Sequence, residues 1–294
     1  MKLSASTLAF SGHDFATACD TIAACGFAYV EPAFIEGYGD FDDAEINVEN
    51  AGVLKTQAEA VGLSCRSVSA HVDMSAADAV PRMVRRLDFA AALEARYLVT
   101  NAGPAGTDDM FAANLEKIAP LAEARNVVIC IENPGHGSSL FPTGGAMAAW
   151  KRRIGHPFID LNYDFGNIFT ASDERLDPAD DLRAVAETAA HFHVKDLLSD
   201  AWGWHMCAIG DGSIDYRSAL PRLAGLRPDA ALSIEMPLRL WRPMRGAARF
   251  KPVPPIAQIA AELTKSRAFV EDRFRPGRPA VNTENGATSD VCND

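Results

Sequence analysis

Four side chains that bind cations or carry protons lie at equivalent places in successive apolar segments of the sequence. Glu132 ends the apolar run 127–131, although a carboxylate is costly to bury in such a setting. Asp164 and Glu235 end later apolar runs, and His193 lies within another. Because side chains two apart on a strand share a face, all four can point the same way from their strands. We expect them to meet in one place.

Three carboxylates gathered together would repel one another and raise one another's pKa values. A divalent cation removes that penalty, and three carboxylates with one imidazole suit Mn²⁺ or Mg²⁺, with Co²⁺ or Zn²⁺ as alternatives. Any one of these acids taken alone is better explained as a solvated loop residue near a strand end. Four equivalent positions favour a site for one divalent metal ion, made by Glu132, Asp164, His193 and Glu235.

The elements that must position these residues are eight short apolar segments that alternate with eight amphipathic stretches. Strands are predicted over 2–7, 27–32, 64–73, 96–103, 127–133, 158–164, 191–196 and 230–236. Helices are predicted over 13–26, 48–62, 77–95, 107–126, 143–155, 177–190, 215–226 and 254–274, with Gly26 and Gly62 ending the first two.

The spacing of the strand ends distinguishes two folds that both alternate strands and helices. Asn101, Glu132, Asp164 and His193 follow one another at intervals of 31, 32 and 29 residues, close to the ~30 residues of one β/α unit. A doubly wound open sheet gives the same alternation. Eight units without a second domain, and no G-x-G-x-x-G after the first strand, favour an α/β fold of the (β/α)8 TIM barrel type over residues 1–275.

Composition limits the partners and the compartment. The 294-residue chain has a net charge of −11, which argues against nucleic acid as a partner. It lacks a signal-peptide pattern and an apolar run long enough to cross a membrane, and its six cysteines form no C-x-x-C pair. We expect a cytoplasmic protein, a disordered tail over 276–294, and either a homo-oligomer or a partner subunit.

Five motifs occur in the order that one known family shows: "IENPG", "YDFGN", "HVKD", "IGDGSIDY" and "SIEMP". Over residues 1–272 the chain resembles the xylose-isomerase-like TIM barrels, the sugar phosphate isomerase/epimerase family of the endonuclease-IV superfamily. The resemblance implies metal ligands at Glu132, Asp164, His193 and Glu235, with both glutamates also moving protons. Asn101 and Asn167 stand where extra histidines would support a three-zinc nuclease, which argues against that activity.

The expected activity is that of a metal-dependent sugar isomerase or epimerase. It would remove a proton next to a carbonyl of a small polyhydroxy substrate and pass through a metal-bound enediolate. A lyase, either a dehydratase or a keto-glycoside lyase, shares that first step and is the alternative. An inactive metal-binding subunit is a third interpretation, against which the complete ligand set argues.

Further residues are predicted to contact the substrate from their positions at strand ends and in a loop. His71 and Asn101 end strands at the same rim, and Lys195 shares a face with His193. Glu31 ends the second strand, and a basic run from Arg239 to Lys251 can serve phosphate, a partner or plain surface. Aromatic residues in a long loop after the seventh strand can wall a sugar ring. The predicted substrate-binding set is His71, Asn101, Asn167, Lys195, Trp204 and His205.

Overall fold

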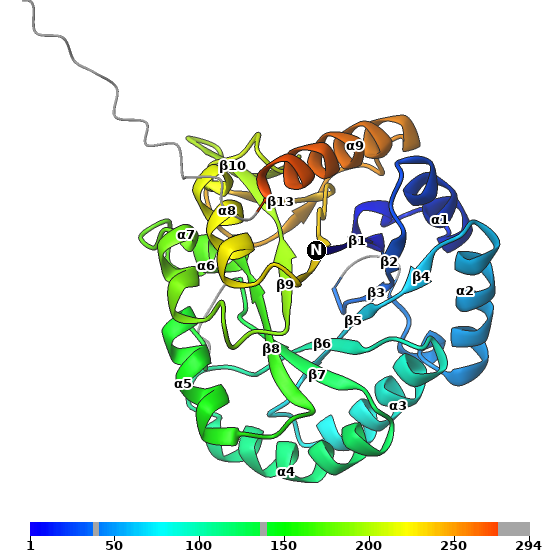
Figure 1. Cartoon of the computed structure of the whole chain (residues 1–294), viewed down its shortest axis with the longest axis vertical. Helices are drawn as coiled ribbons and strands as arrows, with labels where there is room; N and C mark the ends of the chain where they lie inside the picture. The colour runs from blue at the N-terminus through cyan, green and yellow to red at the C-terminus, as the bar shows by residue number, and fades with distance from the viewer. Residues whose placement is uncertain (38–40, 136–139, 276–294) are drawn as a thin grey trace, which may run out of the picture.

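Eight parallel strand positions form the centre of the molecule. The computed structural model describes residues 1–37, 41–135 and 140–275, so the predicted disordered tail lies outside the described residues. Figure 1 shows the helices as a ring outside the strands. The strands are β1 (Lys2–Ser6), β2 (Tyr29–Glu31) with β3 (Ala33–Phe34), β4 (Ser64–Cys65) with β5 (Ser67–Asp73), β6 (Tyr97–Asn101), β7 (Val128–Glu132), β8 (Ile159–Asp164), β9 (His191–Val194) and β12 (Ala231–Ile234).

The strand order closes on itself. It runs β3-β5-β6-β7-β8-β9-β12-β1-β2-β4, and every pairing in it is parallel. Only Pro32 separates β2 from β3, and only Arg66 separates β4 from β5. Since β2 pairs with β4 and β3 pairs with β5, the two ends of the order belong to the same two strands. The predicted TIM barrel is therefore confirmed.

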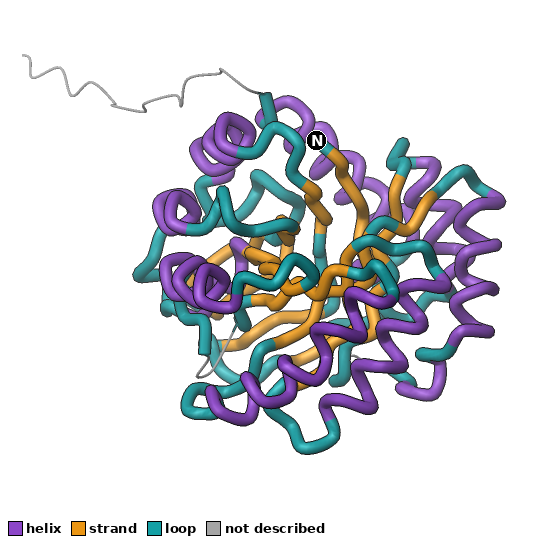
Figure 2. Tube along the Cα trace, turned by 60° about the horizontal axis from the view of Figure 1, so that its bottom comes forward, coloured by secondary structure: helices purple, strands orange, loops and turns teal. Residues whose placement is uncertain are grey.

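The helices pack around the strands, as the two colours in Figure 2 make clear. Gly26 and Gly62, predicted to end the first two helices, lie just beyond them with φ of +83° and +79°, which glycine adopts without strain. The helices are α1 (Phe15–Ala24), α2 (Val48–Ala60), α3 (Ala79–Ala92), α4 (Asp108–Ala124), α5 (Gly144–Ile154), α6 (Phe165–Ala171), α7 (Pro178–Asp181), α8 (Tyr216–Leu226) and α9 (Ile256–Arg273). Among the described residues, none of these helices has the length and apolar character needed to cross a membrane.

The helix predicted over 177–190 is wrong in extent. Only α7 and a 3-10 turn, Leu182–Ala184, form there, and α6 supplies the longer helix of this unit. Arginine side chains from the following β/α unit donate hydrogen bonds to backbone carbonyl groups of this segment. Arg222 donates to the carbonyl of Ala179, and Arg227 donates to that of Ala189 at 2.6 Å. In a continuous helix the carbonyl of Ala179 would accept a backbone N–H instead, whereas that of Ala189 would be one of the last four carbonyls, which have no partner within the helix.

A second, antiparallel sheet stands at the carboxyl end of the barrel, where the sequence predicted only a long loop and a basic run. It contains β10 (Asp196–Asp200), β11 (Gly203–Cys207), β13 (Leu240–Pro243) and β14 (Arg249–Phe250), in that order. Asp200 fixes the β10–β11 turn by accepting the backbone N–H groups of Trp202 and Gly203 at 2.7 and 3.1 Å. Its strands are short, so their alternation was too weak a signal in the sequence.

Candidate metal centre and active site

The four predicted ligands reach the same rim because each lies at the carboxyl end of its strand. Glu132 and Asp164 are the last residues of β7 and β8, and Glu235 directly follows β12. The register places Asp164 opposite His193 of β9. In parallel barrels these strand ends surround one mouth. The position predicted from the apolar runs is thus the position found.

The side chains gather around one atom, Nδ1 of His193. Glu132 Oε1 lies 2.6 Å from it, Glu235 Oε1 lies 3.6 Å away and Asp164 Oδ2 lies 4.0 Å away. All four residues are at most 2% exposed. Glu132, Asp164 and His193 each offer a ligand atom within 4.8 Å of the others. This arrangement brings together the whole predicted ligand set.

The chemistry of the site fits a divalent cation. Glu235 Oε1 is buried and has no hydrogen-bond partner within the described part of the chain, which is costly for a carboxylate oxygen. Three carboxylates would supply oxygen ligands, and His193 would supply one nitrogen, a set that Mn²⁺ and Mg²⁺ accept. Asp164 Oδ1 caps α6 by accepting the N–H of Asn167 at 2.9 Å. The second carboxylate oxygen of Asp164, Oδ2, faces the site.

Lys195 supplies positive charge to the same carboxylates. Its Nζ lies 2.7 Å from Asp164 Oδ2 and 2.5 Å from Glu235 Oε2, and it donates to Asn167 Oδ1 at 3.1 Å. Burial raises the pKa of Asp164, and Lys195 offsets only part of that rise. Burial acts on Glu235 as well, but attraction from Lys195 and His193 lowers the pKa of Glu235 below its ordinary value. Glu235 is therefore held as a carboxylate.

Glu31 contacts Nε2 of His193, on the side of the ring away from the other three predicted ligands. Its Oε1 lies 2.9 Å from His193 Nε2, it accepts a hydrogen bond from Ser67, and it is fully buried. Burial would raise the pKa of Glu31, but His193 and His191 lower it to about 2. An ionised Glu31 favours a proton on Nε2 of His193 and leaves Nδ1 for the metal side.

Glu31 also belongs to a closed ring of polar side chains. Its Oε2 lies 3.4 Å from His191 Nε2, and His191 Nδ1 lies 2.8 Å from Asn162 Oδ1. Asn162 Nδ2 donates to Glu132 Oε1 at 2.6 Å, which completes the circuit through His193. Burial lowers the pKa of His191 to about 4 and keeps its ring neutral. Sequence reasoning missed this ring, for which the alternations "HFH" and "NYD" were the available signal.

A cavity of about 260 Å³ is lined by two of the four predicted ligands, Glu132 and Glu235. Of the predicted substrate contacts, His71, Asn101, Asn167 and Lys195 line it. His71 Nε2 lies 2.9 Å from Ser69 Oγ and 3.6 Å from Glu132 Oε2, and burial lowers the pKa of His71. The antiparallel sheet closes one side, because Leu197, Met206, Leu240 and Arg242 also line the cavity. Sequence reasoning assigned the first three of these residues no role.

The other two predicted contacts lie elsewhere. Trp204, a residue of β11 in the antiparallel sheet, is fully buried, and its indole N–H donates to Glu174 Oε1 at 2.8 Å. His205 stacks on Trp241 with ring centroids 5.4 Å apart. Neither residue is among those that line the cavity. In the basic run, Arg242 faces the cavity, whereas Arg245 pairs with Glu174 at 2.7 Å.

Comparison with known proteins identifies the same architecture. The family model described as xylose isomerase-like TIM barrel matches residues 19–266. The search of curated proteins found no match.

Three similar solved structures are enzymes that act on sugars or related compounds. A D-psicose 3-epimerase solved in the presence of D-fructose is 15% identical, covers 93% of this chain and 99% of its own, and has a TM-score of 0.71. A 3-keto-D-glucoside 4-epimerase from E. coli is 15% identical, with 91% and 99% covered and a TM-score of 0.67. A probable 3-DHS dehydratase from Bacillus anthracis is 16% identical, with 90% and 97% covered and a TM-score of 0.64. At these identities the likeness shows the fold.

Proposed function

Because this chain belongs to the xylose isomerase-like TIM barrel family, we propose that it is a divalent-metal-dependent sugar epimerase or isomerase. The substrate is a polyhydroxy carbonyl compound, and the reaction begins with removal of a proton next to the carbonyl. Epimerases on this fold among the similar structures support the proposal.

One observation carries this proposal. Glu132 and Glu235 come from strands on either side of β8 and β9, and both approach Nδ1 of the same histidine, at 2.6 and 3.6 Å. Both glutamates also line the cavity, together with polar groups that can bind hydroxyls, among them Asn101 and Asn167. Two buried carboxylates that share one small polar cavity can remove a proton and return it.

Metal binding and proton transfer fall to the same set of side chains. A divalent ion held by Glu132, Asp164, His193 and Glu235 would act as a Lewis acid toward the negative charge that develops on the carbonyl oxygen. One glutamate removes the proton from the carbon next to the carbonyl, and the other returns a proton. Return to the opposite face of that carbon gives an epimer, whereas return to the neighbouring carbon gives an isomer. Acid and base groups positioned in this way typically raise the reaction rate about 10²- to 10⁴-fold.

A lyase is the second candidate, and a specific placement favours it. His71 and Lys195 both line the cavity beside the glutamates, so either can give a proton to a leaving oxygen. The first proton removal is the same, and loss of a β-substituent then replaces reprotonation. The dehydratase among the similar structures supports keeping this candidate. Mass separates the two reactions, because an epimerase or isomerase conserves substrate mass and a lyase divides it.

The test uses Glu235→Gln in D₂O. Protein loaded with Mn²⁺ is incubated with ketoses, keto-inositols and 3-keto-glycosides, and products are followed by mass spectrometry and NMR. The native protein should place deuterium on the carbon next to the carbonyl. Glu235→Gln keeps the shape but removes the basicity, so turnover should fall at least ~10²-fold.

Two controls make the result specific. Glu116→Gln, on the exposed face of α4, should behave as the native protein. If Glu235 only returns the proton, Glu235→Gln still exchanges substrate hydrogen while product formation stops; if Glu235 is the first base, both stop together. Full activity of Glu235→Gln loaded with Mn²⁺ would refute its role in proton transfer. Absence of exchange with every substrate in the native protein would reject the proposed function.

A further inference from the structure

A second and larger cavity, of about 560 Å³, lies beside the metal cavity. It is formed by the segment after β1, the segment after β2, and one face of α2. Leu8 and Ile35 line both cavities. The two spaces are therefore neighbours that share two apolar side chains as a common wall.

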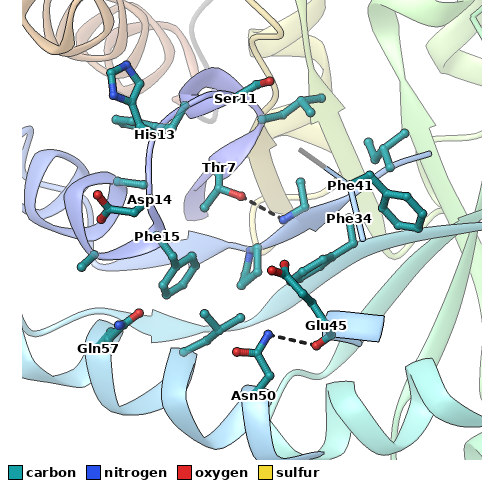
Figure 3. A pocket seen from close by; sticks show the side chains of 18 of the residues that line it. Thr7, Ser11, His13, Asp14, Phe15, Phe34, Phe41, Glu45, Asn50 and Gln57 are labelled. Atoms are coloured by element: carbon teal, nitrogen blue, oxygen red, sulfur yellow. Dashed lines mark hydrogen bonds between the residues drawn. The ribbon is translucent and has the colours of Figure 1, made fainter. Parts of the chain in front are cut away.

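Twelve of the nineteen residues that line this side cavity are apolar, and four of those are phenylalanines. Figure 3 shows Phe15 and Phe34 on either side of it, with Asn50 and Gln57 on the helix below. Val53 of α2 also lines the cavity and is 49% exposed. The cavity is open to solvent on one side, and its volume lies within the ~300–1,000 Å³ range of small-molecule sites.

The charged groups around the side cavity restrict its ligand. Asp14 and Glu45 line it, and neither lysine nor arginine does so within the described residues. An anionic group such as phosphate is therefore disfavoured. Asn50 already donates to the carbonyl of Glu45 at 2.9 Å, and its amide oxygen adds a polar group to the apolar wall. A neutral aromatic group fits this combination.

The metal cavity differs from the side cavity in its charged groups, because two carboxylates, an imidazole, an ammonium and a guanidinium group line it beside apolar side chains. Two adjoining cavities of such different chemistry suit a ligand with two parts. We propose that the substrate is a keto-glycoside of an aromatic group, with its keto-sugar in the metal cavity and its aromatic ring in the side cavity. This inference rests on the proposed function, and it names the substrate class of the same site.

The experiment compares phenyl and methyl glycosides of the same 3-keto-hexose on the full chain loaded with Mn²⁺. Solvent deuterium incorporation gives kcat/KM for each compound. Burial of the phenyl ring should raise kcat/KM at least about tenfold over the methyl glycoside, which is ~1.4 kcal/mol. Equal values would overturn the inference and leave the proposed function standing. No exchange with either glycoside overturns the inference, and the wider substrate panel then decides the proposed function separately.

A filling substitution locates the aromatic group. Val53→Trp enlarges an exposed side chain that lines the side cavity, so it should lower kcat/KM for the phenyl glycoside to about that of the methyl glycoside. Thr56→Trp, on an exposed position of α2 outside the lining, is the matched control and should keep the preference. If Val53→Trp keeps the preference, the ring binds elsewhere and the inference fails.

A direct contact measurement covers the case in which Val53→Trp does not fold. In the native protein loaded with diamagnetic Mg²⁺, the aromatic protons of the bound phenyl glycoside should show intermolecular NOEs to the rings of Phe15 and Phe34. NOEs only to residues outside the side cavity would overturn the inference.

Discussion

At the scale of single residues, the site depends on pairs that lie far apart in the sequence. Glu31 does not face the metal side, yet it contacts the ring nitrogen of His193 opposite Nδ1. A carboxylate in that position orients a ligand histidine and fixes which nitrogen carries the proton. Glu31 is thus a positioning residue, whereas Glu132 and Glu235 lie where the substrate would react.

Glu31→Gln should weaken metal binding about 10- to 100-fold, because the neutral amide no longer favours the proton on Nε2 of His193. Isothermal titration of the variant with Mn²⁺ measures this loss without relying on activity. Glu116→Gln, exposed on α4, is the control and should bind as the native protein does. Unchanged affinity in Glu31→Gln would show that the Glu31–His193 contact does not prepare the ligand.

At the scale of elements, the turn before α8 shows how a motif with glycines supports the site from outside. Buried Asp196, at the start of β10, accepts the N–H groups of Gly210 and Gly212 at 2.9 and 3.0 Å. Gly210 has φ of +93°. The turn therefore fastens β10 against the barrel, and the next residue of β10, Leu197, reaches the metal cavity.

Gly212→Ala should destabilise the protein by about 1–3 kcal/mol, since overpacking at a rigid site costs that much. A Cβ at this position would lie 2.0 Å from Asp196 Oδ1 and 2.6 Å from the backbone oxygen of Leu197. Thermal unfolding measures the loss. Gly225→Ala on α8 is the matched control, because its Cβ would meet nothing within 4 Å, and it should be neutral or slightly stabilising. Equal melting temperatures for the two variants would mean that the turn adapts.

At the scale of the whole molecule, barrel closure brings buried acids from opposite parts of the chain to one mouth. Glu31, Glu132, Asp164 and Glu235 are all at most 2% exposed, and they lie near His193 and Lys195. Concentrated negative charge of this kind is costly unless cations balance it. The stability of the fold should therefore depend on what occupies the centre of the barrel mouth.

Removal of metal with a chelator should lower the melting temperature, because a ligand that binds only the native state stabilises it. At a free Mn²⁺ concentration 100 times Kd the effect is ~2.7 kcal/mol, or on the order of 5–10 °C for a chain of this size. Differential scanning calorimetry with and without Mn²⁺ measures it. Asp164→Asn should show a smaller shift. A native protein that gains no stability from Mn²⁺ would contradict the metal centre.

The sequence alone determined the alternation of elements and the rim on which the chemistry would lie. Apolar periodicity is local, so the strands ending at Glu132 and Asp164 could be predicted from their own residues, and the even spacing of strand ends indicated the barrel. The motif "IGDGSIDY" was also evident in the sequence, and its turn at Gly210 and Gly212 bonds to the buried carboxylate of Asp196.

Contacts across long separations were decided only by the tertiary structure. Glu31 and His193 are 162 positions apart, and closure of the barrel puts them 2.9 Å from each other. Trp204 is fully buried and lies in β11 of the antiparallel sheet, where the sequence predicted a long loop whose aromatic residues could wall a sugar ring. The side cavity exists because the segments around Leu8 and Ile35 meet α2. Hydrophobic pattern sets which face of an element is buried, but only packing in three dimensions sets which residues meet there.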